Sequence, residues 1–194
     1  MKKNNPATTV SDSKNTEPSI ISSFTIRVYG ILMDDKKRIL VSDEFIRGNY
    51  FTKFLGGGLE LGEGTKDCLK REFKEETGMD VIIGNHIYTT DYYQQSAFNS
   101  SQQIIAIYYF AKSVDTIHVE AKLTPFDFTP QQTADPNGQS EVLRWVSWDD
   151  LTEDTVHLPI DKIVVRLIKK EYHSNPVGSS YSLIFCTKSI KYCK

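Results

Sequence analysis

The sequence predicts one α+β or α/β/α domain and excludes a helical bundle and a β-sandwich. Its strand-like and helix-like segments follow the order β-β-β-helix-β-β-β-helix, which mixes the two element types along the chain. The length of 194 residues fits one ordinary domain with short extensions, or at most two small domains. Apolar residues make up 39% of the chain and charged residues 25%, so most of the chain can bury a core.

The two ends of the chain differ in composition from the segment between them. Residues 1–19 hold polar side chains, two prolines and almost nothing apolar, so we expect a flexible tail. The domain is expected to occupy residues 20–172. Residues 173–194 are rich in Ser, Gly and Lys, and we expect a carboxy-terminal extension there without predicting its structure.

Three strands are predicted before the first helix. Phe24–Leu32 is rich in β-branched and aromatic residues, which favour strands. A polar turn at 34–37 separates it from a second strand, Arg38–Ser42, and the two form a hairpin. Phe51–Leu55 is followed by three glycines, Gly56–Gly58, where we expect a regular element to stop or bend.

The first helix is predicted to begin immediately after these glycines. Thr65 is suited to cap its amino-terminal end, and Asp67 places a negative charge in the first turn. Leu69 and Phe73 are four residues apart and share an apolar face. Gly78 is expected to end the helix in the left-handed conformation.

The second half of the chain predicts three further strands and a second helix. Strands are expected at Val81–Asp91, Gln102–Lys112 and Glu141–Trp148. The proline-containing stretch before the last strand should be mostly irregular, with a short strand around Ile117–Glu120. The second helix is expected over Leu158–Glu171, because apolar residues recur there at helical spacing.

Charge and hydropathy exclude several classes of protein. Lysine and arginine total 23 against 25 acidic residues, and this near-balance argues against nucleic acid polymers or anionic membranes as partners. The longest apolar run, Ile104–Ala111, is far shorter than the roughly 20 residues of a membrane span. The first residues do not form a secretory signal. Three cysteines without a paired motif indicate a reducing cytoplasm.

Acidic residues cluster on one side of the first helix. Glu72, Glu75 and Glu76 occupy one arc of about 100° beside the apolar face. Neither Glu72 nor Glu76 has a basic residue three or four positions away on the helix, whereas Glu75 has Arg71. A cation should therefore neutralise the cluster, and hard divalent cations prefer carboxylate oxygens. The plainer interpretation is a solvated acidic helix face.

The residues from Gly57 to Met79 also match a known pattern. Their sequence, GGLELGEGTKDCLKREFKEETGM, fits every fixed position of G-x5-E-x7-R-E-U-x-E-E-x-G-U, where U is apolar. The chain thus resembles the Nudix hydrolases, and the flanking strands resemble that family over residues 22–172. One departure is Leu55, where family members often have proline. The resemblance implies an α/β/α sandwich around a mixed β-sheet, and hydrolysis of a nucleoside diphosphate linked to a moiety X.

The resemblance also implies roles for single residues. Three glutamates and one backbone carbonyl would bind Mg²⁺ or Mn²⁺, namely those of Glu72, Glu75, Glu76 and Gly57. Glu63 and Arg71 would orient the loop and the helix glutamates. Water would attack a phosphorus of the diphosphate while the metal neutralises charge. The first choice for the general base is Glu72, and the alternatives from later segments are Glu120 and Glu141.

Substrate identity stays open at this point. Aromatic and amide side chains after the motif would suit a nucleoside, although sheet packing and loop surface are the plainer interpretation: Tyr88, Tyr92, Tyr93, Gln94, Gln95, Phe98 and Asn99. X could belong to ADP-ribose, a nucleotide sugar, a dinucleotide or a nucleoside triphosphate. Family members that take dinucleotides or nucleotide sugars are often homodimers, so a homodimer is one expectation.

Two other functions share this fold. A catalytically silent sensor of nucleotides or ADP-ribose would favour a degenerate motif and a DNA-binding module, and the short end segments leave no room for one. An isoprenoid diphosphate isomerase would need a catalytic cysteine in the core outside the motif. Cys68 lies within the motif at a variable position and is expected to pack. The sequence therefore favours the hydrolase.

Overall fold

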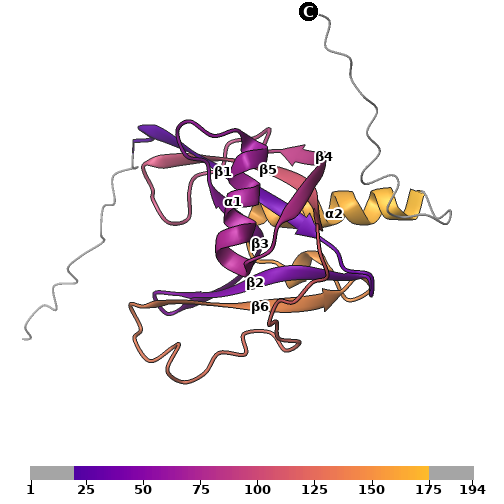
Figure 1. Ribbon diagram of the computed structural model, residues 1–194. Coiled ribbons are helices and arrows are strands. Elements are labelled where there is room, and N and C mark those ends of the chain that lie inside the picture. The colour runs from indigo at the N-terminus through magenta and orange to yellow at the C-terminus, as the bar shows by residue number, and fades with distance from the viewer. Residues whose placement is uncertain (1–19, 175–194) are drawn as a thin grey trace, which may run out of the picture.

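The computed structural model describes residues 20–174 (Figure 1). The expected tail at 1–19 lies outside the described residues, as does the expected extension from residue 175 onward. The described elements are, in chain order, β1 (Ser23–Leu32), β2 (Arg38–Ile46), β3 (Asn49–Gly58), α1 (Thr65–Thr77), β4 (Val81–Thr89), β5 (Gln102–Ser113), β6 (Gln139–Ser147), the 3₁₀ helix η1 (Glu153–Thr155) and α2 (Pro159–Ser174). Among residues 20–174 no helix has the length and apolar character needed to span a membrane.

The strands form one mixed sheet in the order β4-β5-β1-β3-β2-β6. The β1–β5 pair is parallel, and the other neighbouring pairs are antiparallel. Helices α1 and α2 lie on opposite faces of this sheet (Figure 1). Along β1, Val28 and Leu32 pack with α1, while Tyr29 and Ile31 pack with α2, as the twofold alternation of a strand requires. The predicted fold class is confirmed.

The strand predicted before the glycines is present but longer than expected. Strand β3 does not stop at Leu55 but continues to Gly58, with Gly56 paired to Tyr29 and Gly57 to Val28. Gly56 has a φ of +131°, and a Cβ there would lie 2.1 Å from the carbonyl oxygen of Val28. The glycines therefore let two backbones approach closely, and the strand ends at the last glycine instead of before the first.

Two other strand boundaries also differ from the prediction. Strand β2 extends to Ile46 rather than ending at Ser42, because the polar Asp43 is buried inside the sheet with a charged partner. No strand forms at Ile117–Glu120, and the nearest pairing is an isolated bridge between Lys122 and Arg144. These strand boundaries therefore depend on pairing partners that are distant in the sequence.

The ends of α1 agree with the prediction at one end only. Gly64 occupies the cap position, and Thr65 is the first helical residue, with its hydroxyl 2.9 Å from that of Tyr109. Asp67 lies in the first turn as expected. Gly78 has a φ of 73° and donates its N–H to the carbonyl of Lys74, so it ends the helix as predicted.

Candidate functional site

The Gly57–Met79 motif folds into the end of β3, a loop, and α1 packed over that end. Cys68, Leu69 and Phe73 anchor the helix in the core on this face of the sheet. The carboxylate of Glu72 lies against Gly57, where a Cβ would come within 2.2 Å of its oxygen. Any side chain at this position would displace the Glu72 carboxylate, so the glycine lets the strand backbone and a helix glutamate come into direct contact.

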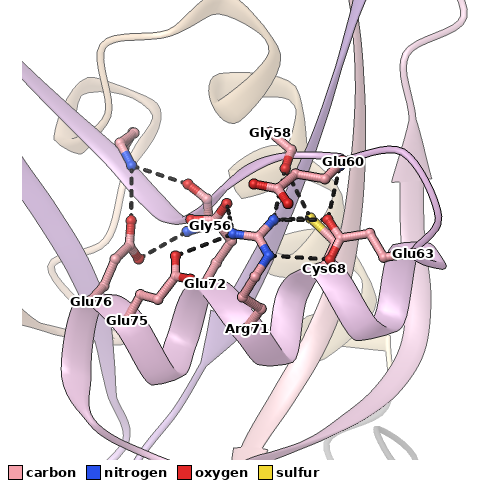
Figure 2. A network of polar contacts seen from close by, with 10 residues as sticks. Gly56, Gly58, Glu60, Glu63, Cys68, Arg71, Glu72, Glu75 and Glu76 are labelled. Carbon is pink, nitrogen blue, oxygen red and sulfur yellow. Dashed lines mark hydrogen bonds and ion pairs between the residues drawn. The ribbon is translucent and has the colours of Figure 1, made fainter.

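Arg71 joins the loop to the helix glutamates (Figure 2). Its Nη1 donates to Glu72 at 2.9 Å and to Glu75 at 3.2 Å. Its Nη2 donates to Glu63 at 2.8 Å and to the carbonyl of Gly58 at 3.0 Å. The hydrogen bonds from Arg71 lower the pKa of Glu63 to about 2. The side chain thus holds three carboxylates and the glycine backbone in one arrangement.

Glu76 takes its cationic partner from the sheet instead of the helix. Its Oε1 lies 3.6 Å from Nζ of Lys53 on β3, and its Oε2 accepts the N–H of Gly56 at 3.2 Å. Burial raises the pKa of Glu76 to about 7, against the opposing effect of Lys53. Glu141 and Glu72 raise it further by repulsion. Glu76 therefore lies where several negative charges meet.

The two alternative bases differ in position. Glu141 on β6 pairs directly with Glu44 on β2, and it accepts a hydrogen bond from Ser42 at 2.8 Å. Its charge acts on Glu76, so the structure brings it to the motif. Glu120 is exposed in an irregular stretch, and its neighbours Val119 and Ala121 pack against the core on the α1 face. The choice between Glu120 and Glu141 as an alternative base stays a prediction.

The donor set suits a hard divalent cation. Carboxylate oxygens and glycine carbonyls are the ligands that such cations prefer. In the part of the chain that the structure describes, no three His, Cys, Asp or Glu side chains are already arranged to hold a metal ion. The carboxylates of Glu72 and Glu75 instead converge on one guanidinium nitrogen of Arg71. In this structure Arg71 is therefore the cation that draws these two carboxylates together, and their role as metal ligands stays a prediction.

A cavity of about 450 Å³ opens beside this cluster. Lys53 and Glu44 line it, and both belong to the ion pairs that lead to Glu76. Its far wall includes the aromatic rings of Phe51 and Phe98, whose centroids lie 5.9 Å apart in edge-to-face geometry. Lys53 therefore connects the cavity to Glu76, although none of the motif glutamates lines the cavity itself.

The aromatic and amide residues singled out in the sequence divide between the cavity and other surroundings. Four of them line the cavity: Gln94, Gln95, Phe98 and Asn99. Tyr88 packs against the core on the α2 face, while Tyr92 and Tyr93 are exposed at the surface. For these three tyrosines, packing and surface roles account for their positions.

Sequence reasoning missed most of the charged lining of this cavity. Arg27, Glu44, Arg47 and Lys53 all contribute to it. Arg27 could have been found from the sequence, because it lies two residues from Tyr29 and the two side chains therefore share one face of β1. Glu44 and Lys53 carried none, since their proximity depends on the register of β2 with β3 and on how α1 packs over the sheet.

Cys68 is a packing residue. It is fully buried, and burial raises the pKa of its thiol to about 12. Its thiol donates to the carbonyl of Gly58 at 3.4 Å. A thiol in this state is not a nucleophile, which removes the one cysteine of the described residues from any catalytic role.

Comparisons with known proteins agree on one family. The family model of the NUDIX domain matches residues 23–167. The solution structure of the Escherichia coli ORF135 protein superposes with a TM-score of 0.57 at 17% identity, over 80% of this chain and 96% of that one. A MutT protein from Methanosarcina mazei Go1 gives 0.54 at 17% identity, over 79% and 98%. A MutT NUDIX hydrolase from Burkholderia pseudomallei gives 0.53 at 16% identity, over 76% and 98%.

These structural identities are low, so the superpositions show the fold alone. A comparison with curated protein sequences finds no match. The family model, however, spans most of the chain and contains the whole Gly57–Met79 motif. The chain belongs to the Nudix domain family.

Proposed function

We propose that this protein is a divalent-metal-dependent hydrolase that cleaves a diphosphate linkage. Its substrate is a nucleoside diphosphate linked to a moiety X, of the ADP-ribose, nucleotide-sugar, dinucleotide or nucleoside-triphosphate type. The single observation that carries the proposal is the carboxylate cluster of α1 against the glycines of β3, which Lys53 links to a cavity of about 450 Å³.

In this proposal the cluster binds Mg²⁺ or Mn²⁺. The ligands are the carboxylates and the carbonyl predicted from the motif, those of Glu72, Glu75, Glu76 and Gly57. When bound, the metal supplies charge neutralisation at the diphosphate. Arg71 and Glu63 position Glu72 and Glu75 through their mutual hydrogen bonds. Such fixed orientation matters because phosphoryl transfer depends mainly on positioning and electrostatics.

The general base is proposed to be Glu72, with Glu141 as the second choice. Glu72 is supported by its place between the glycine backbone and Arg71, where its carboxylate is held in one orientation. Glu141 is supported by its proximity to Glu76. Glu120 stays the third candidate, on an exposed and irregular stretch whose neighbours Val119 and Ala121 pack against the α1 face of the core.

The cavity is proposed to hold the nucleoside part of the substrate. Edge-to-face rings at Phe51 and Phe98 offer apolar surface to a base, and Phe98 is 59% exposed. Carboxamides of Gln94, Gln95 and Asn99 offer both donors and acceptors to the edges of a base. A nucleotide-type small molecule is therefore the proposed partner.

The proposal also covers the cellular location, the partners and the oligomeric state of the protein. Cysteines without a paired motif support the cytoplasm as its location. The balanced charge supports neither a nucleic acid polymer nor a membrane as partner. A homodimer is expected if the substrate is a dinucleotide or a nucleotide sugar, and sedimentation equilibrium measures this directly.

A phosphate-release screen with Mg²⁺ and Mn²⁺ tests the proposal. The panel holds ADP-ribose, NADH, nucleotide sugars, diadenosine polyphosphates, and canonical and oxidised nucleoside triphosphates, with a coupled phosphatase for monoester products. We expect turnover of one class, which would identify X. Metal binding without turnover of any compound would overturn the hydrolase and favour the catalytically silent sensor of nucleotides or ADP-ribose.

A further inference from the structure

Lys53 is a buried cation that the proposed reaction does not use. Its side chain is 8% exposed, and its Nζ lies 3.0 Å from Glu44 and 3.6 Å from Glu76. The same nitrogen donates to the carbonyl of Gly56 at 3.3 Å. It also lies 5.9 Å from the ring centre of Tyr29. Every one of these contacts is to a group that attracts a positive charge.

The burial of this ammonium group has an electrostatic reason. A buried lysine is costly unless paired carboxylates surround it. Glu44 and Glu76 flank it directly, and Glu141 pairs with Glu44 on the neighbouring strand. Lys53 is thus an intramolecular counter-ion for Glu44 on β2 and Glu76 on α1, and the charge of Glu141 on β6 adds a smaller favourable effect.

The position of Lys53 also places it in competition with a metal ion. Glu76 is one of the three helix glutamates proposed to bind the divalent cation, and it already faces the ammonium group of Lys53. A divalent cation at Glu76 and an ammonium group a few ångströms away repel each other, and the buried site screens this repulsion poorly. Metal binding must therefore overcome the charge of Lys53.

We infer that Lys53 competes with the divalent cation for Glu76 and so sets the metal concentration at which the site fills. Glu44 opposes this effect, because it draws the ammonium group away from Glu76 and neutralises part of its charge. The inference rests on the proposed function, since it takes Glu76 as a metal ligand. Lys53 is a positioning residue in this scheme and touches no reacting atom.

Mn²⁺ binding without nucleotide tests the inference, with free Mn²⁺ followed by electron paramagnetic resonance. Lys53→Met removes the competing charge at similar length, and we expect Mn²⁺ to bind about tenfold more tightly. Glu44→Gln releases Lys53 toward Glu76, and we expect binding to weaken about threefold or more. Lys53→Arg keeps the charge and should stay near the wild type. General damage to the fold would weaken binding in every variant, so opposite signs in Lys53→Met and Glu44→Gln exclude such damage.

Lys74→Met is the matched control. Lys74 lies on α1 with its side chain 56% exposed and paired to Asp80, so its charge is screened by solvent. We expect Mn²⁺ affinity within about twofold of the wild type for this variant. Tighter binding equal to that of Lys53→Met would overturn the inference, because loss of any positive charge would then suffice.

The remaining outcomes separate this inference from the proposed function. Unchanged or weaker Mn²⁺ binding in a folded Lys53→Met variant would overturn the inference alone. If that variant does not fold, tighter or unchanged binding in Glu44→Gln would overturn it instead. A wild-type protein that binds no Mn²⁺ at all would overturn the metal assignment of the proposed function, and this inference with it.

Discussion

Two networks of buried charge lie in the same sheet and differ in their balance. In the first, Arg144 on β6 forms a two-pronged ion pair with Asp43 on β2, at 2.6 and 2.9 Å. Thr52 donates to one oxygen of Asp43 at 2.7 Å, and the N–H of Phe126 donates to the other at 3.0 Å. One cation meets one anion, and both oxygens of the carboxylate have their hydrogen bonds.

The second network, at the Gly57–Met79 motif, holds more carboxylates than cations. Arg71 and Lys53 supply its positive charges. Their partners are five glutamates: Glu44, Glu63, Glu72, Glu75 and Glu76. A balanced network leaves no charge for a further ion, whereas a surplus of negative charge leaves room for the added cations that the proposed function requires. The comparison thus sets a balanced ion pair against the network proposed to bind metal.

The largest expected effect is on turnover in the unbalanced network. Glu76→Gln deletes one negative charge at nearly constant volume, and a metal contributes several kcal/mol to charge stabilisation. We therefore expect about a 100-fold or greater loss of turnover with saturating Mg²⁺. Thermal unfolding should show that the fold is retained. Wild-type rates in this variant would mean that the surplus charge has no role in catalysis.

Loss of the cation from the balanced network should reduce stability and leave turnover almost unchanged. Arg144→Met leaves Asp43 buried without its cation, and breaking such a pair costs about 3–5 kcal/mol of unfolding free energy. Chemical denaturation measures this loss, and turnover per folded molecule should change little. The exposed pair of Lys74 and Asp80 serves as control, where Lys74→Met should cost less than about 1 kcal/mol. Equal losses in the two variants would contradict the assignment of a structural role to Arg144.

Asp161 is a third case to compare with the two networks, because its carboxylate has no ion pair within residues 20–174. Asp161 is fully buried, accepts a hydrogen bond from Tyr108 at 2.6 Å, and leaves its other oxygen unpartnered. Burial raises the pKa of Asp161 from 3.8 to about 7. The folded protein thus holds this proton more tightly than the unfolded chain, so the group's contribution to stability falls as the pH rises from about 4 to 7.

Asp161→Asn should remove this pH dependence. We expect the unfolding free energy of the variant, relative to the wild type, to increase between pH 4 and 7, by on the order of 1–3 kcal/mol. Urea denaturation at several pH values measures the difference. A difference that stays constant with pH would show that Asp161 does not titrate in this range, and Tyr108→Phe provides a control that keeps the carboxyl group.

The smallest expected effect concerns Cys68, which lies on α1 and donates its thiol to the carbonyl of Gly58. Its thiol is fully buried with a pKa of about 12, so native protein at pH 8 should leave Cys68 unmodified by iodoacetamide. Peptide mass mapping before and after denaturation measures this. Rapid modification of Cys68 in the native protein would contradict its packing role and return a cysteine to the list of candidate nucleophiles.

Much of the fold was predictable because it follows from local patterns. The apolar face of α1, its end at Gly78 and the cores of all six strands depend on residues a few positions apart. The motif residues were predictable for the same reason, since their spacing along one helix puts the glutamates on one side. The roles assigned to those residues, and the substrate, stay predictions.

The sequence by itself determined the elements, the clustering of Glu72, Glu75 and Glu76, and the family. Only the tertiary structure decided which cationic side chains contact that cluster and which residues line the cavity. Lys53 reaches Glu76 from β3, and Glu141 reaches it from β6, because strand pairing and helix packing join residues far apart in the chain. Electrostatic partners are chosen by distance in space, and periodicity along the chain does not encode that distance.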